Sequence, residues 1–302
     1  MKKFLIRGLL FMTCAVALGM ILFYGSNKIL RKNGNFYLGD DINQVVIGHS
    51  HSQCAINDSL IPGLKNVSNA GESYFYNYLK LKKILEQNPQ VKTVFIEFSN
   101  NHIDTLMNQW IWGEAYMKRY SYLLPYSQKE DQNLIKQRNT KGYLKTLAPW
   151  LKSNLLHIFK NDYDLTDEIG GYRKLTRNHL DSILHNQDIK SDQDIQLHYP
   201  ISQQSISYLQ KMINTCKEYN IKPTLIRSPQ HPKLKMRSNE GQYQAIRNTH
   251  FKHLVFLDFG NFPLADSFYS DLEHLNHRGA KVFTDKFRQS IEDYRVNLPI
   301  SE

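Results

Sequence analysis

Cysteine is scarce in this sequence. Three cysteines occur in 302 residues, and one of them, Cys14, lies in an apolar N-terminal run. Cys54 and Cys216 remain for the rest of the chain, where they form either one disulfide or two buried thiols. A disulfide-rich scaffold is thereby excluded. The fold must rest on a hydrophobic core, which the roughly 270 residues beyond the apolar run are long enough to bury.

Acidic residues are missing from the first 32 positions, which carry six Lys and Arg. Three of these positive charges lie in residues 1–7, and the uncharged, mostly apolar residues 8–25 follow. A helix of that length rises about 27 Å, close to the thickness of the hydrocarbon core of a bilayer. We predict a cytoplasmic n-region at 1–7, a transmembrane signal anchor at 8–25 and a linker at 26–40. The leading positive charges would keep the N-terminus inside, so we expect a single-pass, membrane-anchored protein whose main domain is extracytoplasmic.

A cleaved signal peptide is the alternative to an anchor. Ala15-Val16-Ala17 has the small-x-small pattern of a cleavage site. Cleavage there would leave only a short apolar segment before the cut and an apolar new N-terminus after it, and both features favour the uncleaved anchor.

A strong charge excess is also missing once the N-terminus is set aside. The net charge of the whole chain is +10, but beyond residue 32 there are 32 Lys and Arg against 28 Asp and Glu. We find no basic stripe with interleaved aromatic residues. The sequence therefore predicts no nucleic-acid partner.

Apolar, β-branched runs alternate with amphipathic helical stretches along most of the chain. We predict strands at 42–48, 91–99, 221–229 and 253–260, a short extended segment ending at 66–71, and helices at 73–88, 202–220 and 277–294. This alternation is typical of βαβ units, and it predicts an α/β protein with a three-layer α/β/α fold and a mainly parallel, flavodoxin-like sheet. The domain would span 41–302, with a mostly helical insertion at about 105–200.

Polar residues follow the predicted strands at one edge of the sheet, where parallel strands place their ligand-binding loops. The first of these loops contains Gly48, His49 and Ser50, and a later segment contains Asp271 and His274 three residues apart. A carboxylate at that spacing can accept the Nδ1–H of the imidazole, and the other nitrogen can then activate a serine hydroxyl as a general base. Asp-x-x-His alone is a weak motif, because Asp271 could equally cap the following helix with His274 packed over it.

Four blocks of the sequence resemble those of SGNH (GDSL-like) hydrolases. The blocks are Gly48-x-Ser50, Asn69-Ala70-Gly71, Ser99-Asn100-Asn101 and Asp271-x-x-His274-Leu-Asn-x-x-Gly-Ala. They occur in the expected order and cover residues 42–101 and 253–290. The residues of the first block, together with the predicted anchor, are similar to those of exported SGNH-like proteins that add or remove acetyl groups on bacterial surface polysaccharides.

The resemblance implies a role for each matching residue. Ser50 would be the nucleophile, His274 the base and Asp271 the carboxylate that orients it. The oxyanion hole would consist of the backbone N–H groups of Ser50 and Gly71 and the side chain of Asn100, or of Asn101, because the third block lacks its glycine. The expected function is an O-acetyl esterase or O-acyltransferase that forms an acyl-enzyme and uses no metal or other cofactor. Acylated polysaccharide or an acyl donor would be the substrate, and a membrane-bound O-acyltransferase is a candidate partner.

Three alternatives to this interpretation remain. His49-x-His51 has the spacing of a metal site, but no further cluster of ligands recurs convincingly at the later strand ends. The nucleophile elbow of α/β-hydrolases does not fit, because no second glycine follows Ser50. A non-catalytic, membrane-tethered glycan-binding or assembly protein could retain the same residues.

The remaining polar residues of these loops also receive a prediction. His49 takes the place of the aspartate of the family pattern and should pack beside the nucleophile turn. His51, at the start of the following helix, should either lie at the surface or pack behind the catalytic residues, and the hydroxyl of Ser52 should serve the start of that helix. Three histidines on the predicted edge, His49, His102 and His231, are candidates for substrate contact, although each could be an ordinary loop residue.

Overall fold

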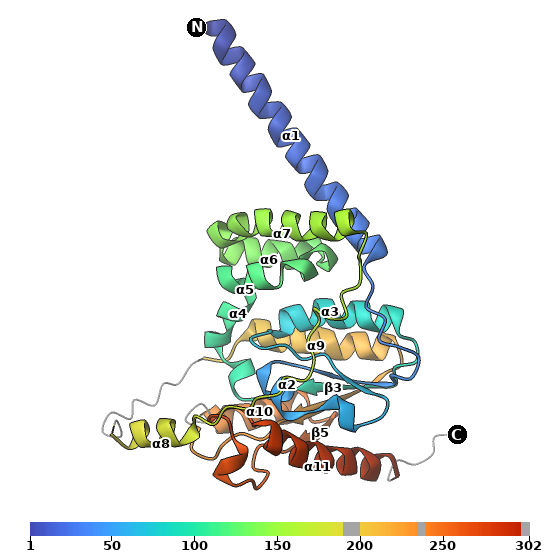
Figure 1. Cartoon of the computed structure of the whole chain (residues 1–302), viewed down its shortest axis with the longest axis vertical. Coiled ribbons are helices and arrows are strands. Elements are labelled where there is room, and N and C mark those ends of the chain that lie inside the picture. Colours follow the sequence, from blue (N-terminus) through green and yellow to red (C-terminus); the bar gives the residue numbers. More distant parts are fainter. Residues whose placement is uncertain (190–199, 235–238, 297–302) are drawn as a thin grey trace. The chain divides into compact units, whose positions relative to one another are not determined.

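The computed structural model describes residues 1–189, 200–234 and 239–296 (Figure 1). The chain divides into two compact units. The helical unit comprises residues 1–36 and 112–165, and the sheet unit comprises residues 37–111 and 166–302.

Five parallel strands form the sheet of the sheet unit. They are β1 (Gln44–Ile47), β2 (Leu64–Asn66), β3 (Thr93–Glu97), β4 (Lys222–Arg227) and β5 (Val255–Asp258). Their spatial order is β2-β1-β3-β4-β5, and each neighbouring pair is parallel. This is the flavodoxin-like strand order, so the predicted fold class is confirmed.

The burial of the strands explains why the sequence predicted them. All four residues of β1 are buried, as are the last four of β3 and the last five of β4. Strands covered on both faces read as continuous apolar runs rather than alternating ones. β5 lies at the edge of the sheet, and its side chains are correspondingly half-buried or exposed.

Helices cover both faces of the sheet. On one side α3 (Tyr74–Gln87) packs against α9 (Gln203–Glu218), with the rings of Phe75 and Tyr208 5.0 Å apart. On the other side α2 (Ser50–Ala55) and α11 (His277–Val296) enclose a core with residues of β1, β3 and β4. Two further helices of this unit are α8 (Leu180–Ile189) and α10 (Glu240–His250). The three layers are those that the sequence predicts.

The helical unit is built around the end of the long N-terminal helix α1 (Lys2–Asn33). It includes α5 (Glu114–Arg119), α6 (Lys129–Arg138) and α7 (Thr140–Lys160), and α4 (Gln109–Trp112) leads into it. α1 is long and apolar enough to cross a membrane.

Two expectations need correction. Residues 26–33 are helical rather than linker, because Ser26, Asn27 and Leu30 are buried within the unit.

The second correction concerns the predicted insertion at 105–200. It is not one piece of structure, because residues 112–165 belong to the helical unit whereas 105–111 and the residues after 165 belong to the sheet unit. Part of the prediction, residues 190–199, lies outside the described residues. Sequence patterns could not show this division, since it depends on which helices pack against α1.

The two cysteines of the sheet unit are separate, buried thiols. Cys54 and Cys216 are both free and not bridged to each other. Burial raises the pKa of each thiol to about 12. Neither is therefore suited to nucleophilic chemistry, which requires a thiolate.

Candidate active site

Ser50 lies at the point where the chain turns from β1 into α2. Gly48 follows the strand, His49 caps the helix and Ser50 is its first residue. A Cβ on Gly48 would approach Glu97 Cβ to 2.4 Å and Ser52 Oγ to 2.6 Å, so only glycine allows the backbone to pass there. The turn leaves Ser50 partly exposed at the carboxyl end of the sheet.

The structure brings Ser50, His274 and Asp271 together. His274 Nε2 is 2.8 Å from Ser50 Oγ, and His274 Nδ1 is 2.8 Å from Asp271 Oδ1. With a proton on Nδ1, the imidazole donates to the carboxylate and accepts the hydroxyl proton of Ser50. This is the arrangement in which a histidine can deprotonate a serine, although the residues are 224 positions apart in the chain.

Asp271 is held as a carboxylate by its own loop. Its Oδ1 also accepts the backbone N–H groups of Glu273 and His274, each at 2.9 Å. Burial opposes ionisation, but the hydrogen bonds and the charge of His274 outweigh it, so the pKa of Asp271 is lowered. Arg177 Nη2 lies 3.6 Å from its Oδ2. The helix-capping alternative for Asp271 is wrong, because α11 begins at His277 and the N–H groups of Arg278 and Gly279 donate to Asn276 Oδ1 instead.

A tight turn carrying Gly71 lies beside the Ser50 turn. The backbone N–H of Asn69 donates to the carbonyl of Gly48 at 3.2 Å, and Gly71 adopts a positive φ of 72°. Glycine is the residue that takes this conformation without strain. Glu72 next to it is fully buried and forms an ion pair with Lys80, which also donates to the carbonyl of Val67. The buried ion pair between Glu72 and Lys80 thus holds the Gly71 turn in place.

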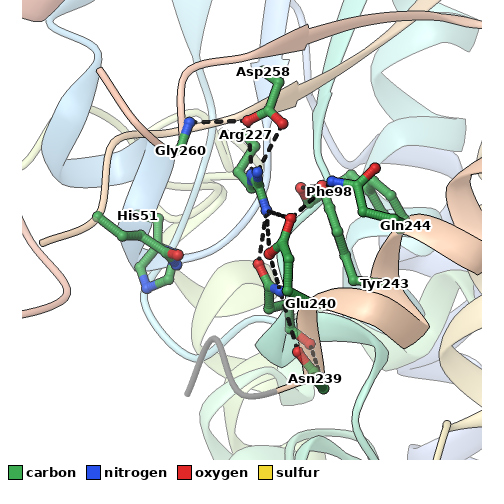
Figure 2. A network of polar contacts seen from close by, with 11 residues as sticks. His51, Phe98, Arg227, Asn239, Glu240, Tyr243, Gln244, Asp258 and Gly260 are labelled. Carbon is green, nitrogen blue, oxygen red and sulfur yellow. Dashed lines mark hydrogen bonds and ion pairs between the residues drawn. The ribbon is translucent and has the colours of Figure 1, made fainter. Parts of the chain in front are cut away.

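Asn100, the preferred oxyanion residue of the sequence analysis, does not fit that role. Its amide nitrogen donates to Asn239 Oδ1 at 3.1 Å and to Glu240 Oε2 at 2.8 Å, and its Oδ1 accepts from Arg227 at 3.1 Å. Figure 2 shows Arg227 between Asp258 and Glu240, with His51 apart from this network. Both amide hydrogens of Asn100 are therefore already used.

Asn101, the fallback, is oriented differently. Ser99 Oγ donates to Asn101 Oδ1 at 2.7 Å, and His49 Nε2 lies 2.8 Å from the same Ser99 Oγ. Fixing the amide through its oxygen leaves Nδ2 as the end that can donate to a ligand. Sequence alone could not separate the two neighbouring asparagines, because what distinguishes them is the contact of Asn100 with Arg227.

The three histidines expected to contact substrate are all buried. His49, His102 and His231 expose 0%, 1% and 3% of their surface, which leaves little of each ring to meet a ligand, and substrate contact by them stays a prediction. His49 does pack beside the nucleophile turn, and its ring lies 4.0 Å from that of His102. His231 instead contacts Asp266, with Nε2 3.2 Å from the carboxylate oxygen.

Burial sets the protonation of this cluster. It lowers the pKa of His49 and His51, and it lowers that of His102 to about 3. Burial also raises the pKa of Glu97 to about 7, although that carboxylate accepts the Oγ–H of Ser228 at 2.6 Å. The rings below Ser50 are therefore neutral near pH 7, and they act by packing and hydrogen bonding.

The structure decides between the two alternatives for His51 and corrects the prediction for Ser52. His51 is buried beside His274 rather than at the surface: its Nδ1 lies 2.9 Å from Gln230 Nε2 and its Nε2 lies 3.7 Å from Glu273 Oε2. Ser52 does not accept free N–H groups at the start of α2: its buried hydroxyl donates to Ser68 Oγ at 2.8 Å and lies 3.3 Å from the carbonyl oxygen of the N-cap residue His49. All residues of α2 after Ser50 are buried, and sequence could not show this because their partners, such as Ser68 and Gln230, lie elsewhere in the chain.

Within the described part of the chain, two groups of side chains have ligand atoms close enough to one another to hold a metal ion. One group is His49, His51 and Glu97, and the other is His51, Glu273 and His274, with the ligand atoms of each within 4.8 Å of one another. Most of these atoms have protein partners, such as Ser228 for the carboxylate of Glu97. Sequence reasoning omitted both carboxylates, since neither stands at metal-ligand spacing from His49-x-His51.

A segment from the predicted insertion also borders the site, which sequence reasoning missed. The backbone N–H of Gly171 donates to Ser68 O at 3.1 Å, that of Arg173 to Gln53 O at 2.9 Å and that of His179 to Ser270 O at 2.8 Å. This placement brings Arg177 to Asp271. No sequence signal predicts it, because the segment has no regular secondary structure.

A protein-family model matches residues 175–295, which is less than half of the chain. A search of curated proteins finds no match.

Solved structures give similarities in fold. One is described as a GDSL-like lipase from Bacteroides thetaiotaomicron, at 10% identity and TM-score 0.37 over 85% of this chain and 93% of the other. A second, provisionally assigned as an acylhydrolase from Bacteroides fragilis, has 12% identity and TM-score 0.38 over 83% and 88%. A third, provisionally assigned as a platelet activating factor from Streptococcus pneumonia, has 11% identity and TM-score 0.38 over 96% and 98%. At this level the similarity carries no argument about substrate.

Proposed function

We propose that this chain is a serine-dependent acyl-ester enzyme of the SGNH type. The observation that carries the proposal is the continuous contact from Ser50 Oγ through the imidazole of His274 to the carboxylate of Asp271, with 2.8 Å at each step. A serine hydroxyl is a weak nucleophile without such a base, and among the described residues His274 is the base that contacts Ser50 Oγ.

The reaction would proceed through an acyl-enzyme. His274 takes the proton of Ser50 as Oγ attacks the ester carbonyl, and Asp271 stabilises the resulting imidazolium. The backbone N–H groups of Ser50 and Gly71 and the Nδ2 of Asn101 would stabilise the oxyanion of the tetrahedral intermediate. His274 then gives its proton to the departing alcohol, and the bond between carbonyl carbon and alkoxide oxygen breaks.

The second step decides between two activities. A water molecule deprotonated by His274 would release the acid, which makes the protein an esterase, whereas a sugar hydroxyl in the same place would make it an O-acyltransferase. Both need the same three side chains. The apolar α1 supports a membrane-anchored protein whose site is extracytoplasmic, and such a location suits acetyl esters of cell-surface polysaccharide.

The test uses the full chain in detergent with an activated acetyl ester, with and without soluble glycan acceptors. We expect acetate release that is lost in Ser50→Ala, and acetylated glycan as product would indicate transfer. Ser52→Ala is the matched control, because this neighbouring hydroxyl faces Ser68 rather than His274. Turnover that survives in Ser50→Ala would contradict the proposal, and an inactive wild-type protein would favour the non-catalytic alternative.

A further inference from the structure

Helix α7 has an unusual exposed face. Three large apolar side chains, Leu144, Leu156 and Phe159, expose 57%, 46% and 81% of their surface. The helix also carries four lysines, Lys141, Lys145, Lys152 and Lys160, and its 21 residues include no acid. A helix that combines exposed large apolar side chains with lysines is typical of one lying at a membrane surface.

Both kinds of side chain lie on the face of α7 opposite the buried Trp150. At 100° per residue, Leu144, Phe159 and Leu156 spread over about 120° of that face. Lys141, Lys145 and Lys152 lie between Leu144 and Leu156 on the same face, and all are exposed. Of these three, Lys145 forms an ion pair with Glu114 at 3.0 Å.

α7 is attached to α1 where the apolar run of the helix ends. The ring of Phe23 lies 4.7 Å from that of Trp150, and Asn154 Nδ2 donates to Asn27 Oδ1 at 2.9 Å and to Ser26 Oγ at 3.2 Å. Lys28, the first charged residue after the run, is exposed. If α1 crosses the bilayer, these contacts hold α7 at the level of the lipid headgroups.

We infer that α7 lies on the surface of the membrane and binds anionic phospholipid. Figure 1 shows one end of α7 next to the C-terminal end of α1, with α6 alongside α7. Its leucines and Phe159 contact the boundary between headgroups and acyl chains, and Lys141 and Lys152 contact phosphate groups. This surface is separate from the acyl chemistry of Ser50, and it shares with the proposed function only the assumption that α1 is a membrane anchor.

The inference can be tested with the full chain in lipid nanodiscs. Cys14→Ser removes the exposed cysteine, since Cys54 and Cys216 are buried. A new cysteine replaces Phe159 or, as the matched control, Glu130, an exposed acid of α6 in the same unit, and each variant is labelled with an environment-sensitive fluorophore. Nanodiscs contain phosphatidylcholine alone or with phosphatidylglycerol, and a share of spin-labelled lipid serves as the quencher.

We expect the probe at 159 to be quenched several-fold more strongly than the probe at 130, and only with phosphatidylglycerol present. Lys141→Gln together with Lys152→Gln should remove most of that difference. Equal quenching at 159 and 130 would overturn the inference, as would quenching that is the same without anionic lipid. A blue-shifted probe at 159 that resists the lipid quencher would instead indicate a second copy of the chain on this face, and would also overturn it.

Hydrolysis of a soluble ester is measured on the same samples. The substitutions in α7 lie outside the proposed catalytic machinery, so activity should remain within about twofold of wild type. Loss of lipid contact with retained activity would contradict only the inference about α7, whereas lipid contact without activity would contradict only the proposed function.

Discussion

Histidines of one cluster occupy two contrasting environments. His274 exposes 18% of its side chain and contacts a hydroxyl on one nitrogen and a carboxylate on the other. His51, whose ring centroid is 5.6 Å from that of His274, is buried and has a pKa that burial lowers. His49 and His102 are also buried, and burial lowers the pKa of each of them as well. The hydrogen-bond partners and the solvent exposure of an imidazole decide whether it can transfer a proton, and its position in a histidine-rich motif does not.

The largest expected effect separates these two environments. We predict that His274→Gln lowers kcat on an acetyl ester by about 10⁴-fold or more, because Ser50 loses its base. His51→Gln should leave kcat within about tenfold of wild type, because its ring reaches Ser50 only through His274. Steady-state kinetics, with circular dichroism to confirm folding, measures both. Equal losses in the two variants would contradict the contrast.

The two adjacent asparagines provide the second comparison. Asn101→Ala should lower kcat by about 10²- to 10³-fold, which is the usual effect of removing one oxyanion donor. Asn100→Ala should instead leave kcat near wild type and lower the free energy of unfolding by about 1–3 kcal/mol, because Arg227 and Glu240 lose a buried partner. Kinetics together with denaturant unfolding separate the outcomes, and a kcat effect confined to Asn100 would reverse the assignment.

A smaller effect should follow from the hydroxyl that orients Asn101. Ser99→Ala removes the donor to Asn101 Oδ1, and we expect kcat to fall roughly tenfold with KM unchanged, because the amide is present but less well placed. The double variant with Asn101→Ala should be no slower than Asn101→Ala alone, since both act through one group. Additive losses in kcat would show that Ser99 acts independently of Asn101.

The buried side chains of His102 and Glu97 should each make the free energy of unfolding depend on pH, with opposite signs. His102 is protonated near pH 6.5 when unfolded but only near 3 when folded, so the free energy of unfolding should fall by up to about 1.4 kcal/mol per pH unit below 6.5. Glu97 binds its proton near 7 when folded and near 4.5 when unfolded, so its contribution rises as pH falls from 7 to 4.5.

The two contributions offset each other between pH 6.5 and 4.5, and single variants should reveal each. Relative to wild type, His102→Phe should let the free energy of unfolding rise as pH falls through this window, because Glu97 remains, and Glu97→Gln should make it fall, because His102 remains. Guanidinium unfolding midpoints at pH 6.5, 5.5 and 4.5 test both signs. If the free energy of unfolding depended on pH in the same way in both variants, the pKa values of His102 and Glu97 would not be shifted in the directions that the structure indicates.

The sequence was informative where a property is local. Continuous apolar runs such as Val45–Ile47 mark buried strands, and the Asp271–His274 spacing is set within one loop. Properties that depend on tertiary neighbours were not readable. Asn100 differs from Asn101 because of Arg227, 127 residues away, and the burial of His51 depends on Gln230. The helical nature of residues 26–33 likewise depends on packing against α7.

Covalent labelling tests the central claim most directly. The full chain in detergent is treated with an alkyl fluorophosphonate, which phosphonylates an activated serine, and the modified residue is identified by peptide mass spectrometry. We predict one adduct, on Ser50, whose formation slows by several orders of magnitude in His274→Gln and is unchanged in Ser52→Ala. An adduct on another residue, or labelling of Ser50 at the same rate without His274, would contradict the account.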